Sequence, residues 1–164
     1  AQALWAVRDF DLAIQSVSGT LQYVSGDALD GDFGTHVILW ASRAISVGQP
    51  EIADSLLQIQ GFRPDLEDWK VSTLKAMSTC VKGNIAEGQK MFAELEGKAP
   101  SQGLHDAKAT TAVVLASIGK DASALLSELR GTSGAFAAYK SKDSNLADDL
   151  VDSEIFERFL DGGL

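Results

Sequence analysis

The sequence predicts an all-α fold: a short α-solenoid of about three to four helix–turn–helix repeats with N- and C-terminal capping helices. Glycines recur at intervals of 35 and 36 residues, at Gly48, Gly83 and Gly119. Small residues stand seven positions before each glycine and five positions after it, at Ala41, Ala76 and Ala112 and at Ala53, Gly88 and Ala124. Such residues let two helices approach closely, and glycine allows the chain to reverse between them.

The chain of 164 residues fits a single domain. We expect an N-terminal helix and loop over 1–34, repeats over 35–66, 67–101 and 102–134, and a degenerate repeat with an acidic capping helix over 135–164. Gly19 is expected to break or bend the N-terminal helix, and the glycine- and aspartate-rich stretch 25–34 is expected to be a loop. Thr35 is expected to cap the leading helix of the first repeat.

Proline and polar residues mark the other helix boundaries. Pro50 suits the first turn of a helix that follows the Gly48 turn. Pro100 is expected to close the second repeat, because proline cannot continue the preceding helix. Asp65 or Asp68 is expected to start the leading helix of the second repeat, and Ser101 that of the third. These predicted helix boundaries agree with the spacing of the glycines, and the agreement strengthens the prediction of a repeat fold.

The end of the first repeat, Gly61-Phe62-Arg63-Pro64-Asp65, resembles the end of a pentatricopeptide repeat. Trp69 follows five positions after the proline, where that family usually has tyrosine. The second helix of the next repeat is similar to those of pentatricopeptide and tetratricopeptide repeats at Gly83, Gly88, Phe92 and Leu95. Two features depart from the pattern: the helix that follows Trp69 is longer than usual, and the third repeat lacks the Pro-Asp ending. The resemblance covers about three-fifths of the chain and implies stacked helical hairpins.

The charge of the chain bears on the choice of partner. Most pentatricopeptide proteins bind single-stranded RNA at about one base per repeat, so three repeats would read only about three nucleotides. A nucleic-acid surface also needs a stripe of basic residues to displace counterions. Here the net charge is −9, and the basic residues are scattered among acidic ones. RNA binding is therefore the disfavoured alternative, and a protein partner is the favoured one.

Two regions are candidate protein-binding surfaces. One is the face formed by the leading helices, with Trp40 and Trp69 as its aromatic residues. The other is the C-terminal segment, which has an apolar and an acidic face. Its candidate contact residues are Ile155, Phe156, Phe159, Asp148, Asp149 and Asp152. Two hypotheses remain open for this segment: a cap that keeps the last repeat soluble, and a helix that docks on a partner.

The sequence offers little to build a catalytic site. Cys80 lies three residues before the helix-ending Gly83, on a face with Met77, and is predicted to be a small buried hydrophobic residue. A nucleophilic role is not expected, because His36 and His105 fall near the starts of neighbouring helices in the repeat alignment. The chain has no Cys/His spacing suited to zinc, no phosphate-binding glycine loop and no apolar run long enough for a bilayer. We expect no enzyme, no metal, no cofactor, no small-molecule substrate and no membrane insertion.

The sequence therefore predicts a non-catalytic structural or protein-interaction subunit of a larger, organellar complex. The alternative is a free adaptor that binds a peptide or helix in its groove. In size and number of hairpins the chain also resembles the pentatricopeptide-like accessory subunits of euglenozoan mitochondrial ATP synthase. That resemblance implies a location in the mitochondrial matrix and attachment to the α-subunit of the catalytic F₁ head; a cytoplasmic location is the alternative. A start at Ala1, without methionine, fits either removal of an import sequence or a trimmed chain.

Overall fold

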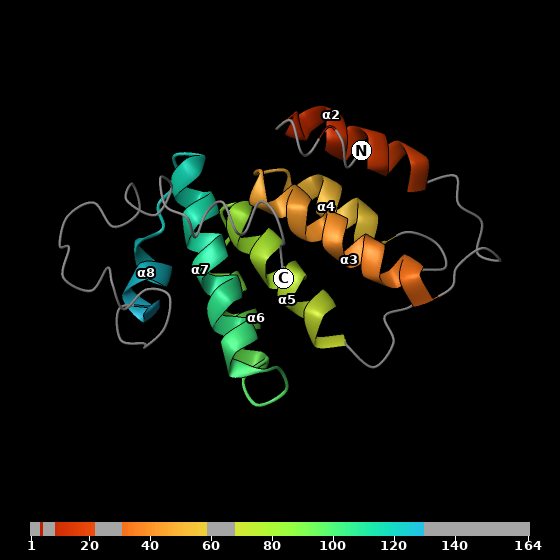
Figure 1. Ribbon diagram of the computed structural model, residues 1–164. Coiled ribbons are helices and arrows are strands. Elements are labelled where there is room, and N and C mark those ends of the chain that lie inside the picture. Colours follow the sequence, from red (N-terminus) through yellow and green to blue (C-terminus); the bar gives the residue numbers. More distant parts are fainter. Residues whose placement is uncertain (1–3, 5–8, 22–30, 59–67, 130–164) are drawn as a thin grey trace.

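The structure, a computed structural model, describes residues 4, 9–21, 31–58 and 68–129. All regular structure in these residues is helical, which confirms the predicted all-α class (Figure 1). The seven helices described are α2 (Phe10–Leu21), α3 (Gly31–Ser46), α4 (Pro50–Leu57), α5 (Asp68–Val81), α6 (Ile85–Glu94), α7 (Ser101–Ser117) and α8 (Ser123–Leu129). The expected helices within 135–164 lie outside the described residues.

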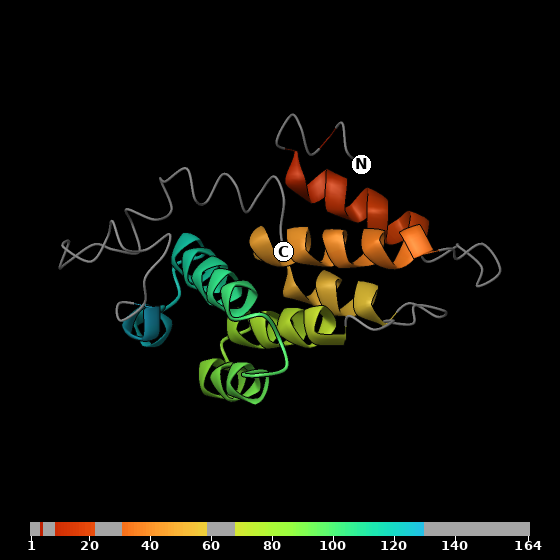
Figure 2. The ribbon, with the colours of Figure 1, turned by 60° about the horizontal axis from the view of Figure 1, so that its bottom comes forward.

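Six of these helices form three hairpins, in which α3 packs on α4, α5 on α6 and α7 on α8 (Figures 1 and 2). The first helix of each hairpin, α3, α5 or α7, is called its leading helix. Helix α5 contacts both of the other leading helices. The N-terminal helix α2 packs on α3 and α4, next to the first hairpin. Buried apolar side chains from all seven helices belong to one continuous core.

The same glycine turn ends the leading helix of each hairpin. Gly48, Gly83 and Gly119 have positive φ angles of 76°, 107° and 71°. In each turn the glycine N–H donates to the carbonyl three residues back, and the next N–H donates to the carbonyl five residues back, at 2.8 to 3.1 Å. These two bonds define the Schellman motif, in which glycine avoids the steric cost of the left-handed conformation.

Small residues lie where the helices of the first two hairpins cross. Ala41 and Ala53 are fully buried in the first hairpin, as is Ala76 in the second. Opposite Ala76, a Cβ atom added at Gly88 would lie 3.0 Å from the Ala76 carbonyl oxygen and would overlap the Cys80 sulfur. The helices α5 and α6 therefore approach so closely that position 88 has no room for a side chain.

The third hairpin departs from the predicted register. Ala112 is fully buried on α7, but Ala124 is exposed on α8, and the buried alanine of this region is Ala122, directly before α8. The reason is a longer turn: α8 starts four residues after Gly119, whereas α4 and α6 each start two residues after their glycine. The Asp121 carboxylate accepts a hydrogen bond from the Ser123 N–H (2.9 Å), which supports the later start.

Two helix boundaries also differ from the sequence prediction. Helix α3 begins at Gly31 and includes Thr35, so the stretch 31–34 is helical and not part of a loop. Helix α2 continues through Gly19, so of the two expected outcomes, a break or a bend, the break does not occur. Glycine costs only about 1 kcal/mol in a helix, and the buried side chains of Ile14 and Val17 hold α2 against the core. Pro50, Asp68 and Ser101 each begin a helix, as their sequence positions predicted.

Candidate functional site

Trp40, a predicted contact residue, lies in the core. Its exposed fraction is 4%, and its ring lies 4.7 Å from the Arg43 guanidinium carbon, measured to the ring centroid. A large aromatic residue on a leading helix can be a core residue or a contact residue, and the sequence alone does not distinguish the two. The packing of α3 places the ring inside, where it stabilises the first hairpin and presents little surface to a partner.

Trp69, the second predicted aromatic, is half-buried at the start of α5. A Cβ atom added at Gly103 would lie 3.2 Å from two carbons of the indole ring, so the ring packs on the first turn of α7. The Lys70 ammonium group lies 5.7 Å from the ring centroid. Trp69 therefore joins the second and third hairpins and retains an exposed edge.

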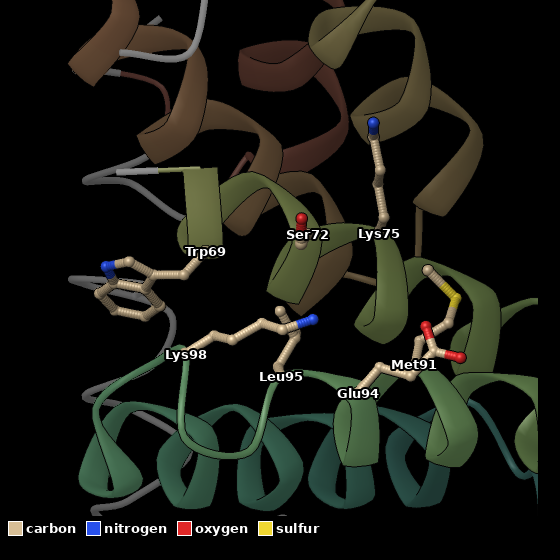
Figure 3. A pocket seen from close by; sticks show the side chains of 7 residues that line it. All are labelled: Trp69, Ser72, Lys75, Met91, Glu94, Leu95 and Lys98. Atoms are coloured by element: carbon tan, nitrogen blue, oxygen red, sulfur yellow. The ribbon is translucent and has the colours of Figure 1, made fainter. Parts of the chain in front are cut away.

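That exposed edge borders a pocket, here called the α5–α6 groove, with a volume of about 430 Å³. Its lining residues come from α5, from α6 and from the turn after α6 (Figure 3): Trp69, Ser72, Lys75, Met91, Glu94, Leu95 and Lys98. Figure 3 shows Trp69 at one end of the groove and Met91 with Glu94 at the other. The groove is one of the surface hollows among the described residues, and it contains a residue that the sequence analysis singled out.

The turn after α6 positions one wall of the groove. Gly97 has a φ of 78°, and the N–H groups of Lys98 and Ala99 both donate to the Leu95 carbonyl at 3.0 Å. This compact turn places the Lys98 side chain beside Leu95, where it extends across the groove in Figure 3. The wall therefore depends on a glycine in the left-handed conformation, which the sequence analysis did not single out.

The groove combines an apolar interior with a charged rim. Leu95 is buried and Met91 is half-buried, and together with the Trp69 ring they supply the apolar surface. The exposed side chains of Lys75, Lys98 and Glu94 supply the charges. Two lysines and one glutamate line the groove, so its lining carries a net positive charge in a chain whose net charge is −9. The sequence does not predict this group of charges, because Lys75 and Lys98 line the same groove only as a result of the turn after α6.

Cys80 is fully buried, as the sequence analysis predicted. Burial raises the pKa of its thiol to about 11, and the nearby Glu128 carboxylate contributes in the same direction. The sulfur lies 4.0 Å from the Ile85 carbonyl oxygen. The thiol is therefore protonated at neutral pH, which makes it a poor nucleophile there.

The two histidines lie on α3 and α7, toward the starts of those helices, whereas Cys80 lies at the end of α5. His36 is exposed near the start of α3, and His105 on α7 has its Nδ1 3.6 Å from the Asp106 carboxylate. In the part of the chain that the structure describes, no three His, Cys, Asp or Glu side chains are grouped so that they could hold a metal ion. None of the described helices is both long and apolar enough to cross a membrane.

The six predicted C-terminal contact residues lie outside the described part of the chain: Ile155, Phe156, Phe159, Asp148, Asp149 and Asp152. Their assignment therefore stays a prediction from the sequence. Comparison with known proteins adds no identification, since no family profile, curated protein or solved structure matches the chain.

Proposed function

We propose that the chain is a short α-solenoid of tetratricopeptide/pentatricopeptide-like hairpins, acting as a non-catalytic structural or protein-interaction subunit of a larger complex. The recurrence of one turn carries the proposal: the same pair of Schellman hydrogen bonds closes Gly48, Gly83 and Gly119. Each glycine ends a leading helix, and neighbouring leading helices contact one another. Stacked hairpins of this kind create extended surfaces that repeat proteins use to bind other proteins.

Polar contacts between neighbouring hairpins support the solenoid arrangement. Asp54 of the first hairpin accepts a hydrogen bond from Ser78 on α5 (2.7 Å) and forms an ion pair with Lys82, directly after α5. Lys120, in the turn of the third hairpin, donates to the Val81 carbonyl at the end of α5 (2.6 Å). Each of these contacts joins one hairpin to the next, as expected for stacked repeats, and the first hairpin also contacts the third through α3 and α7.

The best specific assignment within this proposal is an accessory subunit on the catalytic head of mitochondrial ATP synthase, in contact with the F₁ α-subunit. It rests on chain size, number of hairpins and resemblance to the pentatricopeptide-like accessory subunits. The free adaptor is the second candidate, and the α5–α6 groove favours it because an open hollow with an apolar interior can accept a peptide.

Native affinity purification of the tagged protein from its own cells, with and without nuclease, tests the proposal. We expect stoichiometric recovery of one large assembly that survives nuclease and is identified by mass spectrometry. Recovery of the F₁ subunits would support the specific assignment, whereas weak recovery of individual proteins would favour the adaptor. Partners lost on nuclease treatment would overturn the proposal in favour of RNA binding, despite the net charge of −9.

A further inference from the structure

We infer that the α5–α6 groove binds a short acidic segment of a partner protein, with an aliphatic or aromatic side chain as its anchor. This inference rests on the proposed interaction function and names the chemistry of the partner. The groove lies at one end of the second hairpin, between α5 and the end of α6, and its volume is about 430 Å³. Ligand pockets span about 300–1,000 Å³, so the groove suits a few side chains of an extended segment.

The distribution of charge supports an acidic partner. Residues 68–99, which include the second hairpin, contain five lysines and four acidic residues, whereas the whole chain has 14 basic and 23 acidic residues. Lys82 already pairs with Asp54 of the first hairpin. Lys75 and Lys98 instead have exposed side chains that line the groove. Two cations at a hollow in an otherwise acidic protein select for an anionic segment and disfavour a basic one.

The apolar interior supports an anchored segment over a free anion. Trp69 and Met91 are half-buried at opposite ends of the groove, and Leu95 is buried between the helices. Methionine adapts its shape to different apolar groups, and tryptophan supplies a large contact area with little loss of rotamer freedom. A small anion would use the two lysines alone, whereas a segment with an apolar anchor would use the whole groove.

Three short synthetic peptides would test this inference on the full chain. They share leucine and phenylalanine positions and carry glutamate, glutamine or lysine between them; each has a fluorescent label for anisotropy titration. We expect the glutamate peptide to bind most tightly and to weaken as salt rises, because exposed charges are screened. Equal binding of the glutamate and glutamine peptides, or tighter binding of the lysine peptide, would overturn the inference.

A matched pair of variants then locates the binding. Lys98→Glu and Lys90→Glu change the net charge equally, and both lysines are exposed on the second hairpin, but only Lys98 lines the groove. We expect Lys98→Glu to weaken binding of the glutamate peptide about fivefold. The double variant Lys75→Glu, Lys98→Glu should weaken it about tenfold or more. Lys90→Glu should change binding less than about twofold. If Lys90→Glu weakened peptide binding as much as Lys98→Glu, the peptide would be attracted by the net charge of the protein, and the groove would be overturned as the site.

Two further readouts separate the possible occupants. On binding, the Trp69 indole N–H signal, assigned with Trp69→Phe, should shift in ¹H–¹⁵N spectra. An unchanged Trp69 signal would overturn the inference. The inference would also be overturned if an oligouridine bound more tightly than the glutamate peptide and the same lysine variants abolished that binding, since the groove would then bind nucleic acid.

Purification from cells distinguishes this inference from the proposed function. If the Lys75→Glu, Lys98→Glu variant recovers the same assembly as the wild-type chain, the interaction function stands and the groove is not its contact. Loss of the assembly in this variant alone, with the Lys90→Glu control retaining it, would support the groove. Failure of the wild-type chain itself to recover any protein would overturn the proposed function instead.

Discussion

The second and third hairpins share a turn and differ in how their helices cross. Both leading helices end in the same Schellman motif, at Gly83 and Gly119. In the second hairpin α6 starts two residues later and brings Gly88 directly against α5. In the third hairpin α8 starts four residues later, and Ala124 at the equivalent sequence offset is exposed. An identical turn therefore fixes where a helix ends, but not which residue of the next helix faces it.

The longer turn of the third hairpin has a structural role of its own. Lys120, directly after the turn glycine, reaches the Val81 carbonyl at the end of α5, where an unpaired carbonyl of a helix end accepts a cation well. Ile118, directly before that glycine, lies against Gly48 of the first hairpin. The third turn thus contacts the ends of both other leading helices. The longest of the three turns therefore joins its hairpin to the other two.

The largest expected effect is at the close crossing of the second hairpin. Gly88→Val should destabilise the protein by about 3 kcal/mol or more, because its side chain would overlap Cys80 and the α5 backbone at Ala76. Ala124→Val adds two methyl groups at the same offset in the third hairpin, where the site is exposed. It should change stability by only about 0.5 kcal/mol. Urea unfolding followed by circular dichroism measures both values.

A milder variant keeps this comparison testable if Gly88→Val does not fold. Gly88→Ala should cost about 1–2 kcal/mol, since overpacking outweighs the gain in helix propensity of about 1 kcal/mol. Adding Cys80→Ala should recover part of that loss, because it removes the sulfur that the new methyl group meets. A stabilising Gly88→Ala substitution would contradict the close crossing.

The same comparison shows how far the sequence could predict the structure. The all-α class and the turn glycines followed from glycine spacing, because only glycine tolerates the conformation that ends each leading helix. Ala124 was misplaced because a two-residue change in turn length rotates the next helix by half a turn, and spacing alone does not reveal it. Helix propensity likewise allowed a break at Gly19 that does not occur, since packing of α2 on the core outweighs a local cost.

The candidate site was less predictable than the fold. Trp40 and Trp69 are both large aromatics on leading helices, but the first is buried and the second borders a groove. Lys75 and Lys98 lie 23 positions apart in the sequence and share the groove only because the Gly97 turn returns the chain toward α5. Contacts of this kind depend on tertiary packing and leave no periodic pattern in the sequence.

A smaller effect is expected at the glycine turns. Gly119→Ala should cost about 1–2 kcal/mol, the penalty for alanine in the left-handed conformation, because no atom obstructs a Cβ there. Gly48→Ala should cost about 1 kcal/mol more, since its Cβ would lie 2.8 Å from Ile118 Cγ2. Thermal or urea unfolding of both variants measures the difference. Ile118→Ala should remove the difference, and its persistence would mean that the first and third turns are not in contact.

A pH-dependent effect is expected from Cys80 in the second hairpin. The pKa of its thiol rises from 9.0 to about 11 on folding, so below pH 9 both states retain the proton and stability is unaffected. Between pH 9 and about 11 the unfolded chain loses the proton while the folded chain keeps it. The folded state should therefore lose up to about 1.4 kcal/mol per pH unit in this range. Urea unfolding at pH 8, 9 and 10 measures this slope, and Cys80→Ala provides the control, since it removes the thiol and leaves every other titratable group in place. Equal slopes in the two proteins would mean that the thiol ionises as easily in the folded chain as in the unfolded one, and that water reaches the crossing of α5 and α6.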